Sequence, residues 1–251
     1  MPKICRSFAR MLQQWIIRIL LWPFSMLYGL GALLHEKLYH WGLLKAVSFS
    51  LPVISVGNLT VGGAGKSPHI EYLVRLLREY LEVGVLSRGY RRKSVGFKEV
   101  EPQMGVEESG DEPLQFKRKF PDVLVAVSES RSLGVPRMLM KREDLQVVLL
   151  DDAFQHRAIQ PALNILLTEH DHPFTRDFLL PAGRLREWPA AYRRADIIVV
   201  TKCPADPNEV QREALLREIA PLPHQRVYFS YYQYRQPYFL LDNRYITTLG
   251  E

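Results

Sequence analysis

Cysteine is scarce in this sequence, with only Cys5 and Cys203 among 251 residues. Two cysteines cannot form a disulfide framework, and no cysteine–histidine spacing indicates a zinc site. A reducing compartment is therefore expected rather than a secreted setting. Internal repeats and low-complexity stretches are also missing. A composition of 47% hydrophobic and 24% charged residues excludes a collagen, a coiled-coil rod and a disordered chain.

An excess of positive charge is absent from most of the chain. The net charge is +6, but residues 1–50 hold six Lys/Arg against one acid and so supply +5 of it. The other 201 residues contain 27 basic and 26 acidic side chains. Such a distribution does not support a nucleic-acid-binding surface, and no nucleic-acid partner is expected.

The apolar run near the N-terminus is short. Residues 19–34 carry no formal charge, which makes 16 residues, whereas a helix that crosses a bilayer needs about 20. A secretory signal is disfavoured because charged rather than small residues follow the run. An interfacial helix is favoured, since aromatic and aliphatic side chains accompany Arg6, Arg10 and Arg18, which suit anionic headgroups. A helix packed on the protein's own core is the main alternative.

After residue 50, short apolar runs alternate with longer polar segments of helical period. The expected strands cover residues 51–56, 83–86, 124–127, 145–150, 165–167 and 197–200, and the expected helices cover 69–80 and 208–219. This alternation predicts an α/β fold with a mostly parallel sheet. Residues 226–234, 238–241 and 245–248 indicate further short strands. The sequence then ends without a helix to cover them, so we expect only the start of a second lobe.

A glycine-rich segment lies between the first expected strand and the first expected helix. It consists of Thr60, Val61, Gly62, Gly63, Ala64, Gly65, Lys66 and Ser67. Small residues let backbone N–H groups turn toward phosphate oxygens, while Lys66 would reach the β- and γ-phosphates and Ser67 would bind Mg²⁺. The strict phosphate-loop pattern has glycine where Thr60 stands. The alternative is a glycine-rich turn with a chance Lys-Ser pair.

Two adjacent acids, Asp151 and Asp152, end the apolar run 145–150. Phosphate-loop enzymes place a carboxylate near Mg²⁺ in this way. Adjacent side chains project in different directions, so one acid can hold the metal while the other orients a water or a base. A charged strand-to-loop junction is the alternative, and the nearby Lys66 and Ser67 favour the metal interpretation.

Four weaker signals follow other expected strands. Segment 86–93 carries four cations after a strand, which suits a phosphorylated substrate or a solvated loop. Asp111 stands in an acidic loop that enters a helix, where it could accept a proton. Segment 180–187 holds two arginines and a carboxylate that could reach a transferring phosphate. Segment 199–202 resembles a base-reading strand end, but Pro204 occupies the position where a GTPase has aspartate.

Together these segments resemble the tetraacyldisaccharide 4'-kinases, the lipid A 4'-kinase family. The resemblance runs in order through residues 57–68, 86–90, 110–113, 150–157, 180–187 and 200–202. Its most specific parts are the Gly-Asn-Leu-Thr-Val-Gly-Gly stretch from Gly57 and the Asp-Asp-Ala-Phe-Gln-His stretch from Asp151. Thr60 also fits, because the family's own phosphate loop lacks the first glycine.

The resemblance implies a kinase that uses ATP and Mg²⁺. It would phosphorylate the 4'-hydroxyl of a tetraacylated glucosamine disaccharide 1-phosphate and so form lipid IVA. The glycolipid and the membrane surface would be its partners, at the cytoplasmic face of a Gram-negative inner membrane, where an N-terminal hydrophobic helix holds the enzyme. We expect a monomer.

The resemblance also implies roles for individual residues. The catalytic residues would be Lys66, Arg186 and Asp111, with Arg186 stabilising charge on the transferring group. The metal-site residues would be Ser67, Asp151, Asp152 and Glu187. We assign Arg88, Tyr90 and Arg91 to the substrate's 1-phosphate from their charge and position.

One departure from the family concerns a histidine. The family continues into a second lobe whose histidine pairs with the aspartate that Asp111 matches, and no such motif occurs in this sequence. We predict a membrane-contacting segment at 1–48, a kinase core at 49–222 and the start of a lobe at 223–251. A phosphate-loop switch or binding module, and a catalytically weak fragment that binds ATP only, remain alternative functions.

Overall fold

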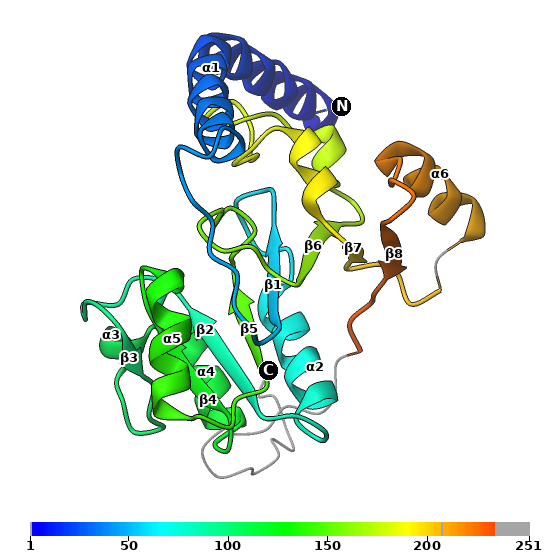
Figure 1. Cartoon of the computed structure of the whole chain (residues 1–251). Coiled ribbons are helices and arrows are strands. Elements are labelled where there is room, and N and C mark those ends of the chain that lie inside the picture. The colour runs from blue at the N-terminus through cyan, green and yellow to red at the C-terminus, as the bar shows by residue number, and fades with distance from the viewer. Residues whose placement is uncertain (1, 207, 234–251) are drawn as a thin grey trace.

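The computed structural model describes residues 2–206 and 208–233, with side chains from Trp15 onward. The strands are β1 (Val53–Asn58), β2 (Val83–Ser87), β3 (Lys98–Glu99), β4 (Leu124–Val127), β5 (Val147–Asp151), β6 (Leu163–Glu169), β7 (Ile197–Thr201) and β8 (Arg226–Phe229). They form one sheet in the order β3-β4-β2-β5-β1-β6-β7-β8 (Figure 1). Every pair of neighbours is parallel except β3 and β4.

Helices cover both faces of the sheet. They are α1 (Pro2–His40), α2 (Lys66–Leu77), α3 (Val106–Ser109), α4 (Asp111–Lys119), α5 (Arg131–Lys141) and α6 (Glu209–Ile219), with short 3₁₀ turns η1 (Phe174–Arg176) and η2 (Pro189–Arg194). Residues of α2 and α4 share one buried cluster with the sheet, and residues of α5 and α6 belong to clusters on the other face. Burial on both faces explains why the central strands are continuous apolar runs.

The predicted α/β architecture is confirmed, and the predicted strands and helices are present with shifts of a few residues. The helix that the acidic loop at Asp111 was expected to enter is α4, whereas helix α5 and the short β3 and α3 were not predicted. The strand expected at 226–234 is β8, which pairs with β7 in the main sheet. The strands expected at 238–241 and 245–248 lie outside the described residues. The three domain limits stay predictions.

Helix α1 lies at one end of the molecule, against the segment between β6 and β7 (Figure 1). Two small residues one turn apart, Ser25 and Gly29, make this contact. The Ser25 hydroxyl donates to the Leu179 carbonyl at 3.0 Å, and the Trp188 indole N–H donates to the Gly29 carbonyl at 2.9 Å. A Cβ on Gly29 would lie 2.6 Å from Leu179 Cδ1. Small side chains therefore allow α1 to approach this segment closely.

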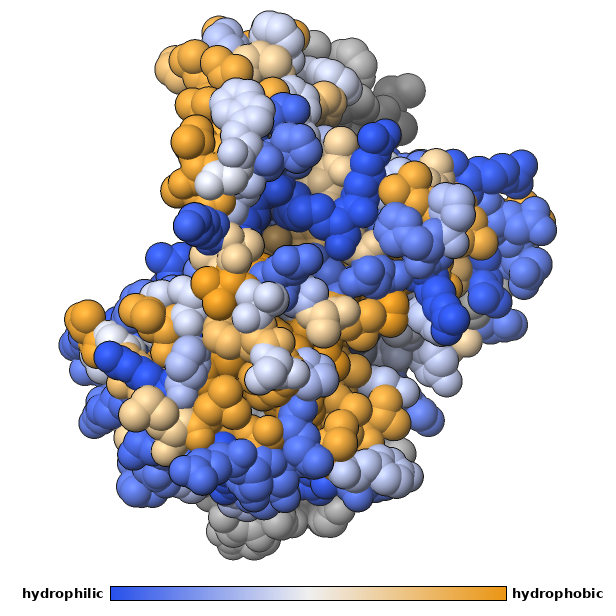
Figure 2. Space-filling model, in the orientation of Figure 1, coloured by the Kyte–Doolittle hydropathy of each residue, from blue (hydrophilic) through white to orange (hydrophobic). Residues whose placement is uncertain are grey.

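From Trp15 onward, the other side chains of α1 are largely exposed and apolar, so packing on the protein's own core does not describe this part of the helix. In Figure 2, hydrophobic surface follows this helix. The exposed large side chains include Trp15, Ile16, Ile19, Leu20, Trp22, Phe24, Leu27 and Leu30. Within α1, Trp15–His40 is long and apolar enough to cross a membrane, by length and composition only. This stretch is 26 residues long. It exceeds the 16-residue uncharged run of the sequence analysis because it also includes the flanking charged residues.

Candidate active site

The phosphate-loop residues connect β1 to α2 and turn through two glycines in the left-handed region. Gly62 has φ 118° and Gly65 has φ 85°. A side chain at Gly65 would also collide with Tyr232, because an added Cβ would lie 1.8 Å from the Tyr232 hydroxyl oxygen. Gly65 is the N-cap of α2, so Lys66 and Ser67 open the helix. Its first N–H groups lack intrahelical acceptors and are suited to an anion.

Neighbouring segments hold this loop in place. Thr60 forms a bridge with Leu185, next to a 2.7 Å hydrogen bond from the Val61 N–H to the Arg184 carbonyl. On the other side, the Thr201 hydroxyl donates to the Ala64 carbonyl at 3.0 Å. Ala64 is buried, whereas Val61, Gly62 and Gly63 are exposed. The loop is thus fixed at both ends and open at its tip.

Three charged side chains meet beside the loop around a buried amide. Lys66 Nζ lies 3.1 Å from Asn58 Oδ1 and 3.6 Å from Asp152 Oδ1. The Arg186 guanidinium donates to both Asp152 oxygens, at 3.1 and 2.9 Å, and to Asn58 Oδ1 at 2.7 Å. The structure therefore brings together Lys66, Asp152 and Arg186, which come from distant parts of the sequence. Asn58 is fully buried, and its Oδ1 accepts hydrogen bonds from both Lys66 and Arg186.

The surrounding cations keep Asp152 charged. Burial alone raises its pKa, but the hydrogen bond from Arg186 and the charges of Lys66, Arg186 and Arg131 outweigh this, and the pKa lies below its ordinary value. Asp152 also has φ 46°, in the left-handed region. Such strained backbone is common at functional sites, where surrounding contacts hold it.

Asp151 has the opposite environment. It is 1% exposed, and its Oδ2 accepts a hydrogen bond from the Ser87 hydroxyl at 3.0 Å. Its Oδ1 has no hydrogen-bond partner within the described part of the chain. Burial, together with the charges of Glu112 and Asp152, raises the pKa of Asp151 to about 6. Arg131 supports this turn by donating to the carbonyls of both aspartates, at 2.7 and 3.0 Å.

Glu112 is a site residue that the sequence analysis missed. Its Oε1 accepts a hydrogen bond from the Ser67 hydroxyl at 2.6 Å. Glu112 lies in the first turn of α4, beside Asp111, whose Oδ1 accepts the Glu112 N–H at 2.9 Å. The Asp111 carboxylate is exposed. The signal was present, since both acids stand in the Gly-Asp-Glu-Pro segment, but only Asp111 was given a role.

Known proteins with similar sequences were compared with this chain. The profile of the family described as tetraacyldisaccharide-1-P 4'-kinase, LpxK, matches residues 17–237. This chain belongs to that family. The tetraacyldisaccharide 4'-kinase of Bacteroides thetaiotaomicron is 47% identical over 235 residues, which is 92% of this chain and 62% of the relative. That of Flavobacterium johnsoniae is 46% identical over 219 residues, 87% of this chain and 64% of the relative.

A solved structure of the LpxK family has the same fold. It is the "apo" form of LpxK from Aquifex aeolicus in complex with ATP, which superposes with a TM-score of 0.70 at 44% identity. The match covers 76% of this chain and 61% of that one. The chain thus spans about three fifths of the length of these LpxK relatives.

Glu187 occupies an ion-pair cluster beside α1. Its Oε2 lies 3.1 Å from the Arg157 guanidinium and 2.9 Å from that of Arg194. Arg157 also pairs with Glu36 of α1 at 3.3 Å. No contact with Ser67 accompanies these pairs in the described residues. A metal role for Glu187 stays a prediction, and its present contacts connect α1 to the segment that carries Arg186.

The predicted substrate residues Arg88, Tyr90 and Arg91 lie exposed after β2. The Arg91 guanidinium stacks on the Tyr90 ring, 5.2 Å from its centre. Arg92 and Lys93, by contrast, form ion pairs with Glu129 and Glu107. Neither Arg88 nor Arg91 forms an ion pair within the described ranges, so these two retain unbalanced charge.

Half-buried His156 is a further feature of the site, and the charge of Arg88 acts on it. Burial, followed by the charges of Arg131 and Arg88, lowers the pKa of His156 to about 4. The imidazole is therefore neutral near pH 7, and the positive surroundings extend from Arg88 toward the aspartate turn. An excess of cations here suits an anionic ligand.

The oxygen groups around Ser67 suit a magnesium ion. Asp151 and Asp152 supply carboxylates and Ser67 supplies a hydroxyl. Burial and then the charges of Glu112 and Asp152 raise the pKa of Asp151, and a bound cation would offset both effects. No group of three His, Cys, Asp or Glu side chains that could hold a metal is found among the described residues. Magnesium does not require one, because it commonly uses one or two carboxylates together with waters and nucleotide phosphates.

Proposed function

We propose that the protein is an ATP-dependent kinase that phosphorylates the 4'-hydroxyl of a tetraacylated glucosamine disaccharide 1-phosphate. The observation that carries the proposal is the meeting of Lys66, Asp152 and Arg186 beside the phosphate loop. Membership of the LpxK family supports the acceptor. The ATP in the Aquifex aeolicus relative supports the nucleotide.

Phosphoryl transfer depends mainly on positioning and charge neutralisation. The loop amides and the α2 N-terminus would hold the phosphates, with Lys66 on the β- and γ-phosphates. Arg186 would neutralise charge on the transferring group. Ser67 and Asp152, with Asp151 behind them, would hold Mg²⁺, which screens the phosphate charge when bound. Release of Ser67 from Glu112 would free its hydroxyl for this role.

Asp111 would accept or guide the proton of the acceptor hydroxyl. Its carboxylate is exposed at the start of α4, and its neighbour Glu112 contacts Ser67, so it stands at the edge of the phosphate loop. Positioned bases of this kind contribute about 10²–10⁴-fold to a rate. Arg88, Tyr90 and Arg91 would meet the substrate's 1-phosphate, since Arg88 and Arg91 have no acid partner among the residues that the structure describes.

The apolar surface of α1 would rest on the cytoplasmic face of a Gram-negative inner membrane. Acyl chains leave a bilayer at a cost of about 0.8 kcal/mol per CH₂, so a glycolipid kinase gains by working at the surface. The contacts of Ser25 and Gly29 would then hold the site at a fixed place relative to the membrane.

Transfer of radiolabel from ATP to the tetraacyl disaccharide 1-phosphate in detergent micelles tests the proposal. We expect Lys66→Ala to abolish labelling and Asp111→Asn to reduce it by about 10²-fold or more. Asp144→Asn, which changes another exposed aspartate, is the matched control and should label normally. Unlabelled lipid, with ATP still bound through Lys66, would overturn the kinase proposal for this chain and favour the ATP-binding fragment.

A further inference from the structure

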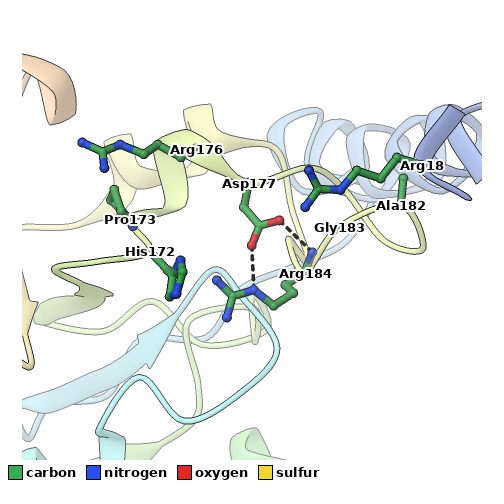
Figure 3. Close-up of a pocket in the computed structure, with 8 residues that line it drawn as sticks. All are labelled: Arg18, His172, Pro173, Arg176, Asp177, Ala182, Gly183 and Arg184. Atoms are coloured by element: carbon green, nitrogen blue, oxygen red, sulfur yellow. Dashed lines mark hydrogen bonds and ion pairs between the residues drawn. The ribbon is translucent and has the colours of Figure 1, made fainter. Parts of the chain in front are cut away.

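A polar cavity lies between α1 and the segment that links β6 to η2 (Figure 3). It borders the phosphate loop through the backbone of Arg184, whose carbonyl accepts the Val61 N–H at 2.7 Å. Its volume is about 400 Å³. The residues that line it are Arg18, His172, Pro173, Arg176, Asp177, Ala182, Gly183 and Arg184. Basic side chains dominate this list, with three arginines and one histidine against a single acid. The kinase proposal uses none of them.

The one acid is already engaged in holding the cavity wall. Asp177 Oδ2 accepts a hydrogen bond from Arg184 Nε at 2.8 Å, and its Oδ1 accepts one from the Arg184 backbone N–H (Figure 3). The same Oδ1 also accepts the Phe178 N–H. The hydrogen bond from Arg184 Nε to Asp177 therefore fixes the orientation of the guanidinium. Its terminal nitrogens form no hydrogen bond or ion pair in the part of the chain that the structure describes.

Arg18 brings a second guanidinium from α1. It stacks on the rings of Trp15 and Phe178, with centroid distances of 5.7 and 5.3 Å. No acid pairs with it among the residues described. Arg176, at the far side, is held by Glu218, outside the cavity lining. The lining side chains therefore carry a net charge of +2, from three arginines and one aspartate, and two of the arginines have free donors.

The rim of the cavity is apolar. Arg18 stands on α1 among exposed Trp15, Ile19 and Leu20, and Phe178 is 43% exposed. A helix that lies in the membrane interface buries such side chains at the boundary between headgroups and acyl chains. Guanidinium groups immediately beside that apolar surface would then stand at the depth of the lipid phosphates.

We propose that this cavity binds the phosphate of an acidic phospholipid headgroup from the leaflet that α1 contacts. The inference rests on the membrane contact in the proposed function. Paired guanidinium groups suit a phosphate because each offers several donors in a fixed plane. A volume of about 400 Å³ is within the range of small-ligand sites, and the apolar rim selects a phosphate that carries acyl chains.

The bound headgroup would also touch the segment that positions Arg186. Residues 177–184 lead directly to Leu185 and Arg186, and the Ala182 N–H donates to the Ser25 hydroxyl of α1 at 3.0 Å. A lipid that bridges Arg18 and Arg184 would therefore hold α1 against this segment. The cavity is thus a contact through which the membrane sets the orientation of the active-site loop.

Vesicle flotation of the full chain, without ATP or glycolipid, tests the inference. The vesicles contain phosphatidylcholine alone or phosphatidylcholine with phosphatidylglycerol. We expect phosphatidylglycerol to strengthen vesicle binding of the wild type. This increase in binding should be about 5-fold smaller in Arg18→Gln and about 30-fold smaller in the double variant Arg18→Gln with Arg184→Gln. The double variant Arg137→Gln with Arg217→Gln is the control, because it removes two exposed arginines from α5 and α6. It should change the increase in binding less than about 2-fold.

Three outcomes would overturn the inference. Equal losses in the two double variants would mean diffuse attraction by net charge. Absence of any phosphatidylglycerol effect would exclude an acidic headgroup. Binding of soluble glycerol phosphate to the protein in the absence of vesicles would assign the cavity to a free phosphate. Arg18→Gln leaves no acid unpaired, so its thermal unfolding should match the wild type. The flotation assay contains neither ATP nor the glycolipid acceptor. Its result therefore does not depend on whether the kinase assay of the proposed function is positive.

Discussion

Gly57 is the position where the structure makes the sharpest prediction. This glycine lies buried in β1, against the turn that carries Asp152. A Cβ at Gly57 would lie 2.7 Å from Phe154 Cβ and 2.8 Å from the Phe154 backbone nitrogen. The Ala153 N–H also donates to the Val56 carbonyl at 3.3 Å, so the strand and the turn are in direct contact. Gly57→Ala must therefore displace backbone.

Gly84→Ala is a matched control in strand β2 of the same sheet. An added Cβ there would meet Met138 Cε at 2.6 Å and Leu145 Cδ2 at 3.2 Å. These atoms are the ends of flexible side chains, which can move away. Overpacking a core costs about 1–3 kcal/mol. We expect Gly57→Ala to lie near the upper end, at about 3 kcal/mol, and Gly84→Ala at about 1 kcal/mol or less.

The two variants should also differ in nucleotide binding. Displacement of the Phe154 backbone moves Asp152, two residues earlier, away from Lys66 and Arg186. We expect the ATP affinity of Gly57→Ala to fall at least about tenfold, or about 1.4 kcal/mol, and that of Gly84→Ala to stay unchanged. Urea unfolding and titration with a fluorescent ATP analogue measure the two effects. Equal stability and equal affinity in both variants would refute the reasoning from the added Cβ.

Three other residues give separate predictions. Asn58→Ala removes the acceptor shared by Lys66 and Arg186, so calorimetry should show ATP affinity reduced about tenfold or more; unchanged affinity would contradict its role. Ser25→Ala leaves the Ala182 N–H unpaired and removes one of the two hydrogen bonds that the Leu179 carbonyl accepts, and urea unfolding should report a loss of about 1–3 kcal/mol. His156 has its folded pKa lowered from 6.5 to about 4, so the unfolded chain binds the extra proton first and stability should fall as pH drops from about 6.5 to about 4. His156→Gln should flatten that part of the stability profile, and an unaltered slope would show that other groups cause it.

The central strands β2, β4 and β5 were predictable because each is a short, mostly apolar run that is buried along its whole length. Helix α5 was not, since Gly134 and Pro136 interrupt its helical pattern. For helix α4 only the entry at the acidic loop of Asp111 was expected, because the acids and lysines of Asp111–Lys119 leave only three apolar side chains to mark its buried face. Both helices are held by the sheet against which they pack rather than by local propensity.

The parts of the site that follow a local pattern could be predicted, and the rest could not. Lys66 and Ser67 lie in a recognisable loop, and the structure places Asp152 beside Lys66 as their pairing suggested. Glu112 contacts Ser67 across 45 positions, which no spacing rule indicates. Asn58 is a common residue type whose role appears only when two distant cations converge on its side chain.

The central claim is that Lys66, Ser67 and Asp152 form one site for ATP with Mg²⁺. Calorimetric titration of ATP into the full chain, with and without Mg²⁺, tests it most directly. We predict binding that Mg²⁺ strengthens in the wild type, that Lys66→Ala abolishes, and that loses its Mg²⁺ dependence in Asp152→Asn. Binding of equal strength in all three proteins, indifferent to Mg²⁺, would contradict the claim and place the nucleotide elsewhere.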